Sequence, residues 1–166
     1  KIIRGISNAA GEIGHTIFEP NGRTCVCGRN GCLATYLTES GLVDICQEAG
    51  YNVKNMHEIM DLYFKKEPWA VKKIEEFVGS ISILLCNMIY TYNTKFVLVG
   101  GSIISDYPIV YDLAYEKLKD MIHDNLYLDV IIKSSTQRKD SVLGAAYVAQ
   151  NEYISELIKN HGEGIG

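Results

Sequence analysis

A histidine and three cysteines near the start of the sequence have the side-chain types and the spacing of a metal site. They are His15, Cys25, Cys27 and Cys32. One imidazole and three thiolates form the ligand set of a closed tetrahedral structural zinc site. Gly28 and Gly31, between the cysteines, allow the sharp turns that bring the three sulfurs together. The sequence therefore predicts structural zinc bound by these four residues, within a zinc-binding segment at 12–33.

Oxidation of the cysteines is the main alternative to a metal site. The chain has five cysteines, and three of them lie within eight residues. A disulfide framework favours an even and more dispersed set, so a metal site in a reducing compartment is the preferred interpretation. Cys46 and Cys86 differ, because they lie on predicted helical faces where a thiol packs as a small hydrophobe. His57, His123 and His161 lie in polar surroundings and are assigned no role.

Glu12 and the glycine pair at 100–101 are further candidates for a binding site. By spacing alone, Glu12 is equally well explained as a solvated carboxylate. However, a metal-bound imidazole at His15 holds its second ring nitrogen as a donor, and a carboxylate or a ligand hydroxyl is its usual acceptor. A polyol is therefore a candidate ligand. Gly100 and Gly101 follow a short β-rich run. Without further context, a plain turn after a strand explains this glycine pair better than a phosphate-binding loop does.

The composition is that of one ordinary soluble domain with a real core. The chain has 166 residues, of which 47% are hydrophobic and 22% are charged. A net charge of −4 and a pI near 5.6 argue against a DNA-binding surface on this chain. No uncharged apolar run of about 18 residues and no signal-peptide pattern is present, which predicts a cytoplasmic protein outside membranes. The abrupt start at Lys1 suggests a single-domain fragment, 1–166, of a longer chain.

Hydrophobic periodicity predicts an α/β domain with helices packed on a sheet. Helices are predicted at 34–49, 55–66, 68–92, 107–124 and 140–159. Strands are predicted at 1–6, 96–99 and 128–133. The 68–92 helix has almost no charge over residues 77–92, so it is expected to be the central buried helix. Asn55 and Glu58 are expected to form a capping box at the start of the second helix.

Several motifs taken together resemble the ROK family, which is named for repressors, open reading frames and kinases. They are GEIGH at 11–15, C-x-C-G-x-x-G-C-L at 25–33, a strand leading into Gly100-Gly101, and LGAA at 143–146. The resemblance implies the C-terminal lobe of an actin-like (ribonuclease H-like) sugar-kinase fold with an inserted zinc knuckle. It also implies that Glu12 and His15 contact sugar hydroxyls, while His15 and the three cysteines hold zinc. In kinase members, the Gly100-Gly101 turn is implied to face the nucleotide.

Two departures from the family pattern bear on function. Family members usually carry a sugar-binding glutamate directly after the C-L pair, whereas this chain has Ala34. Losing that carboxylate is expected to cost roughly 1 to 3 kcal/mol of sugar binding, or about tenfold to a hundredfold in affinity. The family's D-x-G-x-T phosphate loop and catalytic aspartate have no counterpart here. This chain therefore contains no catalytic residue and is not a kinase by itself.

The leading hypothesis is the sugar-sensing effector lobe of a ROK-type transcriptional regulator. In such regulators, binding of a sugar or amino sugar shifts the population of DNA-competent homodimers, and DNA is contacted only through an N-terminal helix-turn-helix that is absent from this sequence. The alternative is the C-terminal lobe of a hexose or N-acylhexosamine kinase, with ATP as its second substrate. A third possibility is a degenerate family member that serves only as a dimer scaffold.

Overall fold

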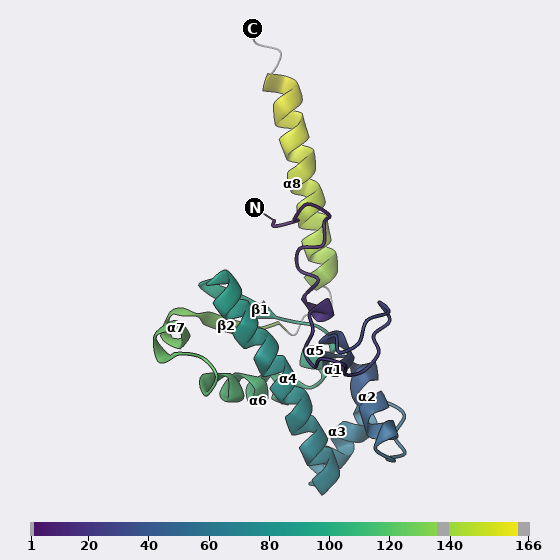
Figure 1. The fold of residues 1–166 in the computed structure, drawn as a ribbon. Helices are drawn as coiled ribbons and strands as arrows, with labels where there is room; N and C mark the ends of the chain where they lie inside the picture. The colour runs from purple at the N-terminus through teal and green to yellow at the C-terminus, as the bar shows by residue number, and fades with distance from the viewer. Residues whose placement is uncertain (1, 136–139, 163–166) are drawn as a thin grey trace.

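The computed structural model describes residues 2–135 and 140–162 of the chain. Its elements in chain order are η1 (Ile13–His15), α1 (Ala34–Leu37), α2 (Glu39–Glu48), α3 (Met56–Phe64), α4 (Pro68–Tyr92), β1 (Phe96–Val99), α5 (Ser102–Asp106), α6 (Pro108–Lys119), α7 (Asp124–Asp129), β2 (Ile131–Ser134) and α8 (Asp140–Gly162). Figure 1 shows α4 crossing the molecule between these elements, while α8 rises away from them beside the N-terminal segment.

Helix α4 forms the centre of the core, as its sequence pattern predicts, and its predicted bounds are confirmed. Pro68 occupies the first turn, where its missing N–H costs no hydrogen bond, and Asn93 ends the helix in the left-handed conformation. The N-terminal half of α4 packs with α2, α3 and α6, and its C-terminal half packs with α6 and β2. Its buried apolar side chains are Ala70, Ile74, Phe77, Val78, Leu85, Cys86 and Ile89.

The length and composition of α4 also satisfy the usual test for a membrane-spanning helix, the only such case in the part of the chain that the structure describes. Half of its most apolar 18-residue window is buried inside the structure. The core helix of a globular domain passes the same test, because a helix covered on most sides is apolar around most of its circumference.

The two strands form a parallel pair, and the predicted β1 is confirmed at its predicted bounds. Phe96 pairs with Ile131, and Val99 pairs with Ser134. The predicted strand at 128–133 is displaced, since β2 begins only at Ile131. The residues before it form α7, a short helix that the sequence patterns did not predict and that has Asp124 in its first turn, where a negative charge favours a helix.

The predicted strand at 1–6 is wrong for the residues that the structure describes. Residues 2–5 form no strand, and Lys1 lies outside the described residues. The backbone reverses at Gly5, where φ is +70°, and the amide of Ala10 donates to the carbonyl of Arg4 at 3.2 Å. This segment therefore closes a loop on itself, which satisfies backbone groups that a strand would pair with a neighbour.

The predicted helix at 34–49 is divided into α1 and α2 at Thr38, whose backbone is extended. The Thr38 hydroxyl donates to the carbonyl of Ala34 and accepts from the amide of Gly41, both at 3.1 Å. It therefore caps α2 while closing α1. A Cβ at Gly41 would lie 2.3 Å from the carbonyl oxygen of Thr35, so glycine is what allows the two helices to meet this closely.

The remaining helices agree with the predicted positions but differ in detail. At the start of α3, Asn55 accepts from the amide of Glu58 as expected, but the Glu58 carboxylate accepts from the amide of Lys54 rather than that of Asn55. The helix predicted at 107–124 ends earlier, because α6 spans Pro108–Lys119. The last predicted helix is confirmed as α8 and extends to Gly162.

Candidate metal centre

The segment before α1 folds as a loop held by backbone hydrogen bonds rather than by a hydrophobic core. Short antiparallel bridges join Ile17 to Cys32 and Thr24 to Asn30. The carbonyl of Gly31 accepts from two successive amides at 2.8 and 3.2 Å, and the amide of Gly31 donates to the carbonyl of Arg23 at 2.8 Å. The loop thus brings both of its arms together at Gly31. We call residues 15–33 the metal loop.

The metal loop gathers the four predicted ligands at one point. Their ligand atoms, from His15, Cys25, Cys27 and Cys32, all lie within 4.8 Å of one another. The Sγ atoms of Cys27 and Cys32 are 3.5 Å apart, and Nδ1 of His15 is 3.7 Å from Sγ of Cys25. Thiolates about 2.3 Å from a tetrahedral ion would lie about 3.8 Å from each other. The cluster therefore has dimensions that fit one tetrahedral metal ion.

The two thiols nearest each other differ in their acidity. The pKa of Cys27 is lowered to about 7, chiefly by a hydrogen bond from the backbone N–H of Arg29 and then by the neighbouring Cys32. Burial raises the pKa of Cys32 to about 11. One thiolate is therefore available near neutral pH, whereas the buried thiol loses its proton readily only when a cation replaces it. Metal affinity should rise with pH, since binding releases protons.

Glu12 and His15 lie at the two ends of the short helix η1, which places both at the edge of the metal loop. The amide of His15 donates to the carbonyl of Glu12 at 3.0 Å, and the Glu12 side chain is exposed. Nδ1 of His15 faces Cys25, so Nε2 is the nitrogen free of the cluster. A Cβ at Gly14 would lie 3.4 Å from the Cβ of Ala34, so the side chain at position 34 adjoins this turn.

Gly100 and Gly101 follow β1, and Gly101 precedes α5 with a φ of +127°, which favours glycine. Gly100 lines a cavity of about 800 Å³ that is also lined by Gly11 and Ile13 of the GEIGH turn. Two motifs far apart in the sequence thus border one cavity. We call it the central cavity. It is large enough for a small ligand, since such sites have volumes of about 300 to 1,000 Å³.

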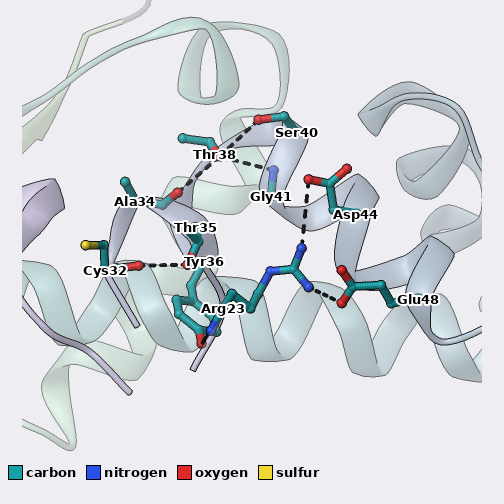
Figure 2. A network of polar contacts seen from close by, with 10 residues as sticks. All are labelled: Arg23, Cys32, Ala34, Thr35, Tyr36, Thr38, Ser40, Gly41, Asp44 and Glu48. Atoms are coloured by element: carbon teal, nitrogen blue, oxygen red, sulfur yellow. Dashed lines mark hydrogen bonds and ion pairs between the residues drawn. The ribbon is translucent and has the colours of Figure 1, made fainter. Parts of the chain in front are cut away.

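A polar network that the sequence patterns did not predict fixes the metal loop to α1 and α2 (Figure 2). The Arg23 guanidinium forms ion pairs with Glu48 and, at 3.8 Å, with Asp44 of α2. The amide of Arg23 donates to the Tyr36 hydroxyl at 3.1 Å, and that hydroxyl donates to Glu19 at 2.6 Å. Burial and the Glu19 carboxylate raise the pKa of Tyr36, which keeps it protonated as a donor. No spacing signal marks these residues, because the contacts join separate elements.

Comparison with protein families and curated proteins gives a consistent result. The model of the ROK family matches residues 1–152. The xylose repressor of Bacillus spizizenii is 25% identical over 159 residues, covering 95% of this chain and 41% of the repressor. The N-acetyl-D-glucosamine kinase of Vibrio cholerae is 26% identical over 158 residues, covering 89% of this chain and 52% of the kinase. The N-acetylmannosamine kinase of Haemophilus influenzae strain PittEE is 23% identical, covering 69% of this chain and 42% of the kinase. This chain therefore spans about half or less of the length of these relatives.

Solved structures show the same fold. A ROK hexokinase from Thermus thermophilus superposes with a TM-score of 0.80 at 20% identity, covering 92% of this chain and 52% of the hexokinase. A ROK glucokinase from Streptomyces griseus, solved with glucose and AMPPNP, superposes with a TM-score of 0.76 at 22% identity. The match covers 91% of this chain and 55% of the glucokinase. A ROK transcriptional regulator homologous to E. coli MLC superposes with a TM-score of 0.67 at 22% identity. The match covers 83% of this chain and 37% of the regulator. The predicted α/β lobe of an actin-like sugar-kinase fold is confirmed, and with the family model matched over residues 1–152, the chain belongs to the ROK family.

Proposed function

We propose that this chain is the sugar-sensing effector lobe of a ROK-type transcriptional regulator. Sugar bound beside the metal loop would modulate DNA binding by an N-terminal helix-turn-helix outside this sequence. The main support is Ala34, a methyl group beside the GEIGH turn where the family usually presents a glutamate. A protein that only senses a sugar tolerates a weaker site than a kinase, which must orient a nucleophilic hydroxyl.

The extent of the alignments does not separate the two candidate functions. The xylose repressors of two Bacillus species align over 95% and 94% of this chain, and the N-acetyl-D-glucosamine kinases align over 89%. The regulator assignment brings further expectations with it. We propose a cytoplasmic homodimer, in which the ligand is a sugar or an amino sugar and DNA is contacted only by the other domain.

The metal in the cluster is proposed to be zinc. A donor set of one imidazole and three thiols within 4.8 Å suits zinc better than it suits magnesium or calcium, which prefer oxygen ligands. With all four positions taken by the protein, zinc would supply a rigid anchor and no reaction chemistry. His15, Cys25, Cys27 and Cys32 would then hold η1 and the start of α1 in a fixed relation.

Glu12 and His15 are proposed to be the sugar contacts. The exposed Glu12 carboxylate can accept hydrogen bonds from sugar hydroxyls, and Nε2 of His15 can donate one while Nδ1 faces the sulfurs. Because His15 would serve both the metal and the sugar, loss of the metal is expected to weaken sugar binding as well.

The second candidate function is the C-terminal lobe of an ATP-dependent ROK sugar kinase. The observation that favours it is the central cavity, which joins Gly100 after β1 to Gly11 and Ile13 of the GEIGH turn. In this function, the Gly100-Gly101 turn would face ATP while Glu12 and His15 hold the sugar. The catalytic aspartate would come from residues outside this sequence.

The variant Ala34→Glu tests the sugar site. It is expected to bind its sugar about tenfold to a hundredfold more tightly than the natural protein, because a carboxylate again accepts hydrogen bonds from hydroxyls. Titration calorimetry of the intact protein with D-xylose, D-glucose and N-acetyl-D-glucosamine measures this. Ala49→Glu, at an exposed position after α2, is the matched control and should leave the affinity unchanged.

A DNA-release assay and a phosphorylation assay with the same sugars separate the candidate functions. Sugar binding that releases the intact protein from operator DNA supports the regulator. ATP-dependent phosphorylation of a bound sugar would support the kinase instead. If neither Ala34→Glu nor the natural protein binds any of these sugars, the sugar site is refuted and the dimer scaffold is favoured.

A further inference from the structure

A second cavity, of about 510 Å³, lies between the metal loop and helices α2, α4 and α6. It shares no lining residue with the central cavity, so it is a separate site. We call it the lateral groove. Its apolar lining comes from Phe18, Leu42, Ile45, Phe77, Ile83 and Met121. These side chains form a surface that could cover the flat or branched body of a small molecule.

One lysine in the lateral groove is not used by the fold. Lys117 reaches from α6 across α4 at Gly79, where a Cβ would lie 3.1 Å from its Nζ. Within residues 2–135 and 140–162, no carboxylate forms an ion pair with Lys117. In contrast, Lys73 on the same groove is paired with Glu76 at 2.8 Å. Lys117 is therefore a positive charge available to a ligand.

Arg23 also lines the lateral groove but offers a ligand no free donor. Its terminal nitrogens pair with Glu48 and Asp44, but its Nε is buried and has no acceptor among the described residues. An N–H that water cannot reach is equally closed to a ligand oxygen, so Lys117 is the group in this groove that remains to meet an anion. The Glu19 carboxylate on this wall is already engaged by the Tyr36 hydroxyl at 2.6 Å.

We propose that the lateral groove binds a small organic monoanion with an apolar body, such as an aromatic or branched carboxylate. Its carboxylate would meet Lys117, and its body would lie on the apolar lining. A groove of about 510 Å³ falls within the usual range for such ligands. Because one wall is the Phe18–Arg23 part of the metal loop and another is α4, the ligand would act as an effector that holds the loop against the core. This proposal does not depend on the sugar site.

Fluorine NMR of the intact protein with 4-fluorophenylacetate tests the proposal. The natural protein is expected to bind this probe saturably. Lys117→Met keeps the aliphatic stem but removes the charge, and it should weaken binding of the anion about fivefold to tenfold. Lys119→Met is the matched control, since Lys119 lies on the same helix, pairs with Glu116 at 2.6 Å and does not line the groove. It should bind the probe as the natural protein does.

Two further measurements locate the probe. The uncharged 4-fluorobenzyl alcohol should bind equally to the natural protein and to Lys117→Met, because it has no charge to lose. Ile83→Trp should fill the groove and block both probes. The proposal is overturned if the natural protein binds no anion saturably, or if Lys117→Met binds it unchanged. A dimer that dissociates in Ile83→Trp, together with no probe binding, would assign the groove to a second copy of this chain instead.

Discussion

Replacing Cys27 with serine is expected to abolish metal binding and to lower the free energy of unfolding by about 4 kcal/mol or more, the range seen when a structural metal is lost. Cys27 is an exposed residue, so without a metal this substitution would change stability by only about 0.5 kcal/mol. The difference arises because the metal loop has few buried apolar side chains of its own to hold it closed.

Cys86→Ser provides the comparison for this prediction. Cys86 is buried in α4, and its thiol contacts the carbonyl of Met121 at 3.4 Å. A serine there is an ordinary polar substitution in the core, expected to cost about 1 to 3 kcal/mol without any loss of metal. Urea unfolding and metal analysis of both variants in reducing buffer measure the two effects. If the exposed Cys27→Ser is less harmful than Cys86→Ser and retains its metal, Cys27 is not a metal ligand.

Replacing Gly31 with alanine is expected to prevent the metal loop from closing. The backbone of Gly31 has a φ of +78°, and a Cβ there would lie 1.8 Å from the carbonyl oxygen of Glu19. That contact is with backbone, so the two arms of the loop would have to separate. We expect a loss of stability of roughly 3 kcal/mol or more together with loss of the metal. Thermal unfolding in the presence and absence of zinc measures both.

Gly28→Ala is the matched control for Gly31→Ala. Gly28 also has a left-handed backbone, with a φ of +83°, but apart from its chain neighbours no heavy atom of the described residues lies within 4 Å of the position of its Cβ. Its substitution should cost only the conformational penalty, about 1 to 2 kcal/mol, and should leave metal binding intact. Equal losses of stability and of metal in the two variants would show that the close approach of Glu19 to Gly31 is not what closes the loop.

The features that could be predicted from the sequence are those that a local pattern determines. Apolar side chains at helical spacing and few charges identified α4 as the core helix, and an unbroken β-rich run ending in two glycines identified β1. The four candidate ligands could be grouped because three of them lie on one tight loop, where short spacing limits how far apart their sulfurs can be.

The features that were missed depend on contacts between separate elements. The helix pattern at 34–49 continues through Thr38, and only the hydroxyl bonds of that residue and the close packing at Gly41 divide it into α1 and α2. The apolar run at residues 1–6 resembles a strand, but the described part of it turns back at Gly5. The ion pairs of Arg23 with α2 join residues more than twenty positions apart, so no motif reveals them.

The central cavity connects these results to the proposed function. It joins Gly100, which could be assigned no function from its own surroundings, to Gly11 and Ile13 beside the metal loop. The resemblance to the ROK family implied a ligand at each of these two turns, and the fold places both turns on one cavity. Glu12 and the metal loop itself are not among its lining residues, so both adjoin this cavity only through Gly11 and Ile13.

The metal content of the purified protein tests the central claim most directly. The claim is that one zinc ion, held by His15, Cys25, Cys27 and Cys32, orders the loop beside Glu12. Protein prepared in reducing buffer without chelators is expected to carry about one zinc ion per chain, with X-ray absorption showing one nitrogen ligand at about 2.0 Å and three sulfur ligands at about 2.3 Å. Absence of metal from such a preparation, or a metal bound without sulfur ligands, would contradict the claim.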